Sequence, residues 1–289
     1  MMPVIQGHRG ARGVYPENTL EGFQYLLDQD IQGTEIDINL SAQGDLIIVH
    51  DHCTHADLHR DASDHWIVDD RRWIDLDRSQ IATINAGAIR PDSDYARRFP
   101  RQRILDRAAV PDYVDLVNLL QSHGSPFHLT IEVKHDPGNL KPDLGFYADR
   151  VVETLSRHRF DGSLTVQSFN WAMLRAIRER VPNVILGCLS EQQSDINTIT
   201  GSDGNDWTDG LRIEDFGGSV PAMVREFGAA YWAPYYPDLN VSLVKEAHQC
   251  DLQVCTWTVN DVNCMQKLLI WGVDSIISDY PVTLINNLI

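Results

Sequence analysis

The chain has 289 residues, of which 43% are hydrophobic and 22% are charged, so it can form one large barrel-like domain or two ordinary domains and is not globally disordered. Its formal net charge of -17 at pH 7 disfavours nucleic acid and anionic membranes as partners, because both would repel it. A small anionic substrate is compatible with this charge, since a few cations and a metal ion can reverse the field locally.

The sequence contains no apolar run long enough to span a bilayer. The segment 1–7 lacks a basic stretch followed by an apolar one, so no signal peptide is visible and a cytoplasmic location is expected, although a trimmed chain would look the same. The five cysteines are irregularly spaced, which predicts reduced, mostly buried thiols and argues against a cysteine-based zinc site. The pattern does not define an oligomeric state.

Short apolar runs alternate with helical patterns along most of the chain. Strands are expected at 3–7, 33–38, 127–134, 163–167, 184–189, 229–233, 252–257 and 273–278. Helices are expected at 18–29, 112–121, 143–158, 171–180, 219–228, 242–249 and 261–271. A further apolar run at 45–49 follows a turn signal at 41–44. This order predicts a (β/α)8 TIM barrel.

The rhythm is interrupted after the second strand region. Residues 52–111 are polar and irregular, so we expect one TIM-barrel catalytic domain over 1–289 with a small insertion, a cap, at 52–111. The alternative fold is a doubly wound open sheet. It is disfavoured because the glycines of the first turn, at 7–13, are interrupted by a histidine and two arginines, which match a dinucleotide-binding turn poorly.

Polar residues able to do chemistry fall at the ends of the apolar runs, where TIM barrels carry their active sites. They are His8, Arg9, Glu35, Asp37, His50, Glu132 and Lys134. Glu35 and Asp37 are two positions apart on one strand and therefore share a face, and Glu132 and Lys134 have the same spacing on the next barrel strand. Each taken alone suits a solvated or structural role, but together they predict one site.

The residue types indicate the chemistry. Three carboxylates suit a hard divalent cation, Mg²⁺ or Ca²⁺, which can polarise a phosphoryl oxygen. Arg9 and Lys134 can hold the remaining anionic oxygens. His8 and His50 titrate near neutral pH and suit an acid–base pair, with the assignment of acid and base left open. These are the groups that metal-assisted phosphodiester cleavage requires.

Sequence segments in a fixed order carry a family resemblance along nearly the whole chain. They are Gly7-His8-Arg9-Gly10, Pro16-Glu17-Asn18-Thr19, Glu35-Ile36-Asp37, His50-Asp51, Ile131-Glu132-Val133-Lys134, Trp257-Thr258-Val259-Asn260 and Gly272-Val273-Asp274-Ser275-Ile276-Ile277-Ser278-Asp279-Tyr280-Pro281. In this combination the sequence resembles the glycerophosphodiester phosphodiesterases. The resemblance implies a TIM barrel that hydrolyses small glycerophosphodiesters to sn-glycerol 3-phosphate and an alcohol, through a cyclic phosphate.

The resemblance also assigns roles by position. It implies that Glu35, Asp37 and Glu132 bind one divalent cation, Mg²⁺ or Ca²⁺. His8 and His50 become the general acid and base.

Further positions carry substrate contacts in the same resemblance. Arg9 and Lys134 become phosphate contacts, and Gln167 and Trp257 line the substrate pocket, although Trp257 would serve equally well as barrel filling. A departure from the family pattern occurs at Leu58-His59-Arg60-Asp61, in a segment expected to affect the leaving alcohol more than the chemistry.

Two other functions are compatible with a barrel of this kind. A phospholipase D or sphingomyelinase D-type barrel lacks a large insertion at this place and acts at lipid surfaces, which the charge disfavours. A non-catalytic phosphodiester-binding barrel would lack a histidine or a carboxylate of the set, and none is missing.

The acidic stretch at 190–218 contains, at 203–210, a poor match to a calcium loop, so a mobile polar loop is expected there.

Overall fold

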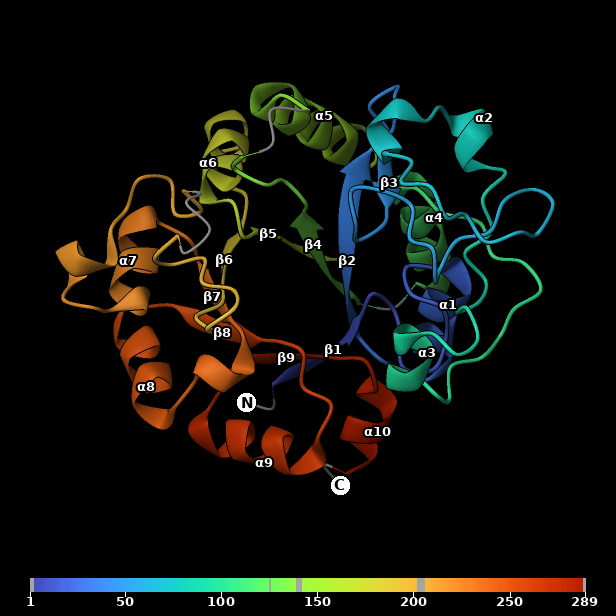
Figure 1. The fold of residues 1–289 in the computed structure, drawn as a ribbon. Coiled ribbons are helices and arrows are strands. Elements are labelled where there is room, and N and C mark those ends of the chain that lie inside the picture. Colours follow the sequence, from blue (N-terminus) through green and yellow to red (C-terminus); the bar gives the residue numbers. More distant parts are fainter. Residues whose placement is uncertain (1–2, 125, 139–141, 202–205, 288–289) are drawn as a thin grey trace.

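The computed structural model describes residues 3–124, 126–138, 142–201 and 206–287. Eight parallel strands close into a barrel, one extra strand lies beside it, and helices surround it (Figure 1). The strands follow each other around the barrel in the order β1-β9-β8-β7-β6-β5-β4-β2, and the pairing of β1 with β2 closes the ring. The predicted (β/α)8 TIM barrel is confirmed.

The strands are β1 Val4–His8, β2 Gly33–Leu40, β3 Leu46–Ile48, β4 His128–Val133, β5 Ser163–Ser168, β6 Leu186–Ser190, β7 Tyr231–Pro234, β8 Gln253–Thr256 and β9 Ser275–Ser278. The barrel helices are α1 Leu20–Asp28, α4 Tyr113–His123, α5 Leu144–Arg157, α6 Trp171–Arg180, α7 Val220–Phe227, α8 Val241–Gln249, α9 Val262–Trp271 and α10 Pro281–Asn286. Short helices are η1 Trp73–Asp75, α2 Arg78–Ile81, α3 Asp94–Arg98, η2 Ile213–Phe216 and η3 Tyr236–Asp238.

Most barrel helices begin at a side chain that caps them. The capping side chain accepts a hydrogen bond from a backbone N–H in the first turn, which satisfies a donor that the helix itself leaves free. The caps are Thr19, Asp112, Asp143, Asn170, Ser219, Asn240 and Asp261. Each helix N-terminus follows the carboxyl end of a strand, so these caps fix the loops that surround the mouth of the barrel.

Strand β2 is buried at every position, because one face lies inside the barrel and the other lies under helices. Its outward residues Ile36 and Ile38 belong to the main hydrophobic core, together with Leu116 of α4. Since side chains alternate along a strand, Glu35 and Asp37 point into the barrel. Apolar packing on the outer face therefore positions two carboxylates on the inner face.

The apolar run after β2 forms β3, which folds back antiparallel on the end of β2. Ile38 pairs with Ile48, and Leu40 pairs with Leu46. This pairing carries β2 to Leu40, beyond the expected strand end at 38. Alternate residues of the segment face two cores: Leu46 and Ile48 belong to the main core, whereas Ile47 and its neighbour Val49 belong to a separate small cluster.

The insertion at 52–111 supplies the rest of this small cluster. Ile67, Trp73, Ile81 and Ile84 are its buried members, and η1, α2 and α3 are the helices of the insertion. The segment is therefore more ordered than its polar, irregular sequence indicates. Its few apolar residues are too widely spaced to give a periodic pattern, yet they meet in the fold.

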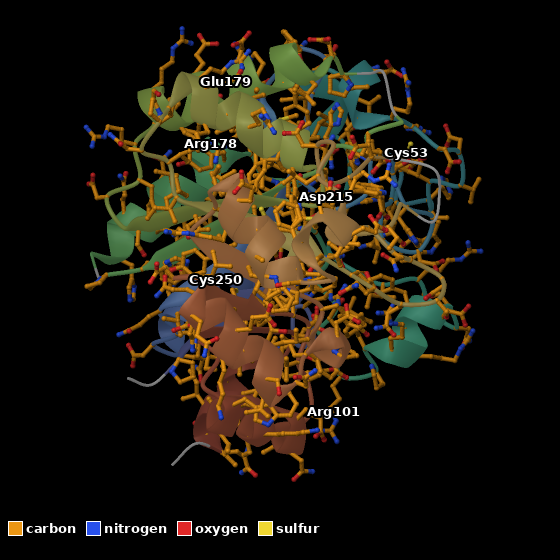
Figure 2. The ribbon with its side chains drawn as sticks, turned by 90° about the vertical axis from the view of Figure 1, so that its left-hand side faces the viewer. Cys53, Arg101, Arg178, Glu179, Asp215 and Cys250 are labelled. Carbon is orange, nitrogen blue, oxygen red and sulfur yellow. The ribbon has the colours of Figure 1, made fainter. Side chains whose placement is uncertain are left out.

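A side view separates the two ends of the barrel (Figure 2). Cys53 and Arg101, which belong to the insertion, lie toward the right of this view. Arg178 and Cys250 lie toward the left, and each is close to the C-terminus of a helix that precedes a barrel strand. The insertion thus lies toward the end of the barrel where the strands finish. All five cysteines fall within the described residues and are free, as predicted, but only Cys188 and Cys255 are buried, so the expectation that most are buried was wrong. No helix among the described residues could cross a bilayer.

Candidate active site

Strand register brings the predicted site residues to one level of the barrel. His8 at the end of β1 lies beside Glu35 of β2. Asp37 of β2 lies beside Glu132 of β4, and Glu132 lies beside Gln167 of β5. The closed ring therefore places residues from four strands around one point.

Glu35, Asp37 and Glu132, here called the acidic triad, converge in this ring. Each offers a carboxylate oxygen within 4.8 Å of those of the other two. All are buried, with 2%, 1% and 8% of their surface exposed. Burial, and then repulsion from Asp37 and Glu132, raises the pKa of Glu35 well above its usual range.

The acidic triad passes a test of fit for a metal ion. Within the described residues, Glu35 Oε1 is buried and has no hydrogen-bond partner. A buried, unpaired carboxylate oxygen is costly unless a proton or a cation compensates it. Converging carboxylate oxygens are also the ligands that Mg²⁺ and Ca²⁺ prefer. The residues present therefore suit a divalent cation.

Two cations adjoin the acidic triad. Arg9 Nε lies 3.1 Å from Asp37 Oδ2, and Lys134 Nζ lies 3.2 Å from Asp37 Oδ1 and 2.5 Å from Glu132 Oε1. Burial opposes ionisation of Asp37, but Lys134 and Arg9 together hold its pKa below its usual range. Glu17, 3.0 Å from Arg9 Nη1, fixes the guanidinium from the other side. Asp37 is therefore flanked by two cations at ion-pair distance, whereas Glu35 has, among the described residues, only a hydrogen bond from Arg9 N, at 3.2 Å, and the more distant His8.

His8 is held by a buried carboxylate that follows the last strand. Its Nδ1 lies 2.7 Å from Asp279 Oδ1, and its Nε2 lies 3.9 Å from Glu35 Oε2. Arg12 Nε and Asn260 Nδ2 also donate to Asp279, each at 2.7 Å. Burial and the nearby Arg12 lower the pKa of His8 to about 3, against the opposing effect of Asp279.

His50 follows β3 and has a similar but more open environment. Its Nδ1 lies 2.7 Å from Asp51 Oδ1, and 34% of its side chain is exposed. Burial lowers its pKa, and Arg9 and Lys134 contribute in the same direction. Each of the two predicted histidines thus engages a carboxylate through Nδ1, which leaves Nε2 as the ring nitrogen available to a substrate.

A cavity of about 680 Å³ opens over this ring at the mouth of the barrel. Every predicted site residue lines it except Asp37, which is 1% exposed: the lining members are His8, Arg9, Glu35, His50, Glu132, Lys134, Gln167 and Trp257. Gln167 is 2% exposed, and Trp257 is only half-buried, so the indole forms part of the cavity wall. The insertion contributes Leu58, Tyr95 and Arg98 to the same wall.

Several residues of the site were not assigned roles from sequence. Asp279 lies within a segment that carried the family resemblance, but its contact with His8 depends on β9 lying beside β1. A carboxylate directly after the last apolar run was the available signal. Asn18 donates to Asp37 Oδ2 at 3.1 Å, and Tyr95 hydrogen-bonds Glu17 from the insertion. Asn18 and Glu17 belong to the segment 16–19, which carried the resemblance without a role for either residue, whereas Tyr95 lies in the insertion, outside every recognised motif.

The weak calcium-loop match at 203–210 lies partly outside the described residues. Asp206, which is described, accepts backbone hydrogen bonds from Thr208 at 3.2 Å and Gly210 at 3.0 Å. In the described parts of the chain, the acidic triad is the only group of His, Cys, Asp and Glu side chains whose geometry could hold a metal ion.

The fold and the site define a TIM-barrel enzyme with two carboxylate-held histidines beside a candidate metal site. The model of the glycerophosphoryl diester phosphodiesterase family matches residues 8–283. The chain therefore belongs to this family of phosphoric diester hydrolases.

Individual relatives span nearly the whole chain. A glycerophosphodiester phosphodiesterase of Caldanaerobacter subterraneus subsp. tengcongensis is 23% identical over 286 residues, covering 99% of this chain and 98% of the relative. A crystal structure from Silicibacter pomeroyi DSS-3, assigned to the same family, is 31% identical with a TM-score of 0.87 and covers 99% and 93% of the two chains. An Oleispira antarctica phosphodiesterase, solved with its product sn-glycerol-3-phosphate, is 21% identical with a TM-score of 0.73, covering 99% and 97%.

Proposed function

We propose that the protein hydrolyses glycerophosphodiesters to sn-glycerol 3-phosphate and an alcohol, with one divalent cation, Mg²⁺ or Ca²⁺, in the acidic triad. The observation that carries the proposal is the convergence of two histidines, two cations and the triad on one cavity. Family membership supports the reaction class. The product bound to the Oleispira antarctica relative supports the glycerol phosphate half of the substrate.

Glu35, Asp37 and Glu132 would hold the cation. When bound, such a cation polarises a phosphoryl oxygen and neutralises developing charge on it. Arg9 and Lys134 would bind the anionic phosphate from either side, the guanidinium as a fork and the ammonium as a point charge. Both cations reach the cavity while remaining anchored on carboxylates, so their positions are fixed before the substrate arrives.

His8 and His50 would move the protons. One histidine takes the proton of the glycerol 2-hydroxyl while that oxygen bonds to phosphorus, and the other gives a proton to the alcohol oxygen as its bond to phosphorus breaks. Water then opens the cyclic phosphate with the two roles exchanged. A well-oriented neighbouring hydroxyl has an effective concentration on the order of 10⁵ M or more, which favours this route over attack by free water.

The remaining cavity residues would position the substrate. Gln167 offers an amide at the floor of the cavity beside Glu132, and Trp257 offers an aromatic wall. The insertion at 52–111 would act as a cap that helps to select the alcohol, because two of its side chains, Leu58 and Arg98, line the same cavity as the catalytic groups.

The proposal is tested by turnover of glycerophosphocholine with product analysis, before and after exhaustive chelation and with Mg²⁺ or Ca²⁺ restored. We expect sn-glycerol 3-phosphate and choline, no turnover after chelation, and recovery with one of the two ions. Release of phosphocholine and glycerol would overturn the assigned bond cleavage. Full activity in the chelated protein would overturn the metal assignment.

A further inference from the structure

The half of the cavity mouth away from the acidic triad has a different chemical character. The carboxyl ends of four consecutive strands, β5 to β8, are followed by Phe169, Glu191, Tyr235 and Trp257, one from each strand. All four line the cavity and are half-buried. We call these four side chains the aromatic–acid wall. The acidic triad, by contrast, lies on β2 and β4.

The aromatic members of the wall contact each other around Trp257. The ring of Phe169 meets Trp257 edge-on with centroids 5.5 Å apart, and the ring of Tyr235 lies tilted against Trp257 at 5.1 Å. Tyr236 continues the series at 5.4 Å from Tyr235. Mutual contact limits the motion of these rings, so they present a preformed surface. Aromatic faces attract a desolvated organic cation through the ring quadrupole.

Glu191 adds a carboxylate to this surface. Among the described residues, no Lys, Arg or His forms an ion pair with it, and no cation contributes to its pKa. Burial raises its pKa to about 7, and the nearby Asp238 and Asp195 add to the effect. Asp238 is itself occupied by hydrogen bonds from Gln192 N, at 2.8 Å, and from Gln193. Glu191 is therefore a partly buried acid that faces the cavity without a counterion from the described residues.

We propose that the aromatic–acid wall is a subsite for a cationic alcohol, so that the protein prefers glycerophosphodiesters whose alcohol carries a quaternary ammonium group. The inference rests on the proposed hydrolysis of glycerophosphodiesters. Glycerol and phosphate bring no positive charge, so only the alcohol half of the substrate can supply the missing counterion. Aromatic faces beside a carboxylate provide both attractions that a trimethylammonium group can use.

The charges on the opposite side of the cavity also favour binding of the alcohol at the aromatic–acid wall. Arg9, Arg12 and Arg98 line it and would repel a cationic alcohol while attracting phosphate. On the side of β1 and the cap, Arg9 and Arg12 are paired with the carboxylates of Glu17 and Asp279. On the side of β5 to β8, Glu191 lies among aromatic rings and forms no ion pair with a described residue. A zwitterionic substrate with its phosphate beside Arg9 and Lys134 and its cation at Glu191 matches this division.

The test compares glycerophosphocholine with an analogue in which 3,3-dimethylbutanol replaces choline. The two alcohols have the same shape, but the analogue has no charge. We expect kcat/KM of the wild type to favour glycerophosphocholine by about 10-fold, as a cation–π contact and a carboxylate together allow. In Glu191→Gln the ratio should fall toward one. Tyr235→Leu should also lower the ratio, which provides a second variant should the first fail to fold.

Asp195→Asn is the matched control, because it removes an exposed negative charge near Glu191 that does not line the cavity. Because Asp195 contributes to the raised pKa of Glu191, the comparison is made at pH 8, where this variant should keep the wild-type ratio. Equal turnover of the two compounds by the wild type would overturn the subsite, as would an equal loss for both compounds in Glu191→Gln. Absence of any cleavage of either compound, by contrast, would overturn the proposed function itself.

Discussion

Asp279 holds Nδ1 of His8 at 2.7 Å across a separation of 271 positions in the sequence. His8 and Arg12 hold the pKa of Asp279 below its usual range although burial opposes this, so the carboxylate is ionised and can only accept. His8 must therefore carry its proton on Nδ1. Its Nε2 consequently faces the cavity with a free lone pair, which is the state a general base requires.

Asp279→Asn should lower kcat by about 100-fold or more, because the amide no longer forces the proton onto Nδ1 of His8. KM should change far less. The ¹⁵N chemical shifts of the His8 ring should show a mixture of tautomers in the variant and one tautomer in the wild type.

Asp274→Asn provides the matched control. Asp274 pairs with His248 at 3.0 Å away from the cavity, so this variant also loses an aspartate–histidine contact. It should retain kcat. A normal kcat in Asp279→Asn, or an equal loss in both variants, would contradict the positioning role of Asp279.

Substitutions in the acidic triad should separate activity from stability. Glu35→Gln removes one of three crowded carboxylates, so in the presence of a chelator Tm should rise by about 2 °C or more. Asp37→Asn leaves Arg9 and Lys134 without their shared anion, so the free energy of unfolding should fall by on the order of 3 kcal/mol. Both variants should lose about 100-fold or more in kcat/KM.

Calorimetric titration with Mg²⁺ or Ca²⁺ checks the cause of the activity loss. The wild type should bind one ion, and both variants should bind it much more weakly. Unchanged ion affinity in either variant would show that its carboxylate is not a ligand. A fall in Tm for Glu35→Gln in the chelated protein would contradict the repulsion inferred within the triad.

A substrate lacking the glycerol 2-hydroxyl should bind but should not turn over, because ring formation needs that oxygen. Its inhibition constant against glycerophosphocholine should be close to the KM of the natural compound. Turnover at a comparable rate would exclude the cyclic route and favour direct attack by water. His8→Ala and His50→Ala should be nearly inactive on either route, and they serve as controls for the histidine pair.

The preference for a cationic alcohol should depend on pH. The pKa of Glu191 is raised to about 7, so the carboxylate is protonated at lower pH and loses its attraction for a cation. The ratio of kcat/KM for glycerophosphocholine and its uncharged analogue should therefore fall between pH 8 and pH 6. The ratio cancels effects of pH on His8 and His50, because both compounds share the same reacting groups.

Three other titratable groups adjoin Glu191. Asp238 and Asp195 raise its pKa, and the phenol of Tyr235 stays neutral in this range because its own pKa is raised, chiefly by burial. In Glu191→Gln the ratio should be flat across the same interval. If the ratio of the wild type did not change with pH, the preference for a cationic alcohol would not depend on the ionisation of Glu191.

The cap should influence the choice of alcohol without affecting the ion. Leu58→Ala and Arg98→Ala remove two side chains that the insertion places in the cavity wall. Each should change the ranking among choline, ethanolamine and glycerol esters by several-fold, whereas calorimetric ion affinity should stay at the wild-type value. An unchanged ranking in the double variant would show that the cap does not select the alcohol.

Local patterns in the sequence were sufficient to predict the barrel. Its strands are short apolar runs bounded by turns, and the spacing of Glu35 and Asp37 by itself places both carboxylates on the same face of β2. The family motifs brought His8 and His50 into the same site. Each of these signals lies within a short segment of the chain.

Features that depend on distant contacts were not predicted. The role of Asp279 requires the ring to close between β9 and β1. Glu191 and Tyr235 belong to no recognised motif, and only the adjacency of β6 to β7 unites them. In the insertion, Trp73 and Ile81 belong to no periodic apolar pattern, so the sequence did not predict that they pack in one core.

The two-sided packing of β3 has a consequence for engineering. Ile47 and Val49 complete the core of the insertion, while Leu46 and Ile48 complete that of the barrel. A chimera that exchanges only 52–111 with a relative would pair a foreign cap with native Ile47 and Val49, and we expect such a protein to be poorly packed. A viable transplant of alcohol specificity would include the β3 hairpin and begin at the turn 41–44, so the hairpin is the natural boundary for recombination.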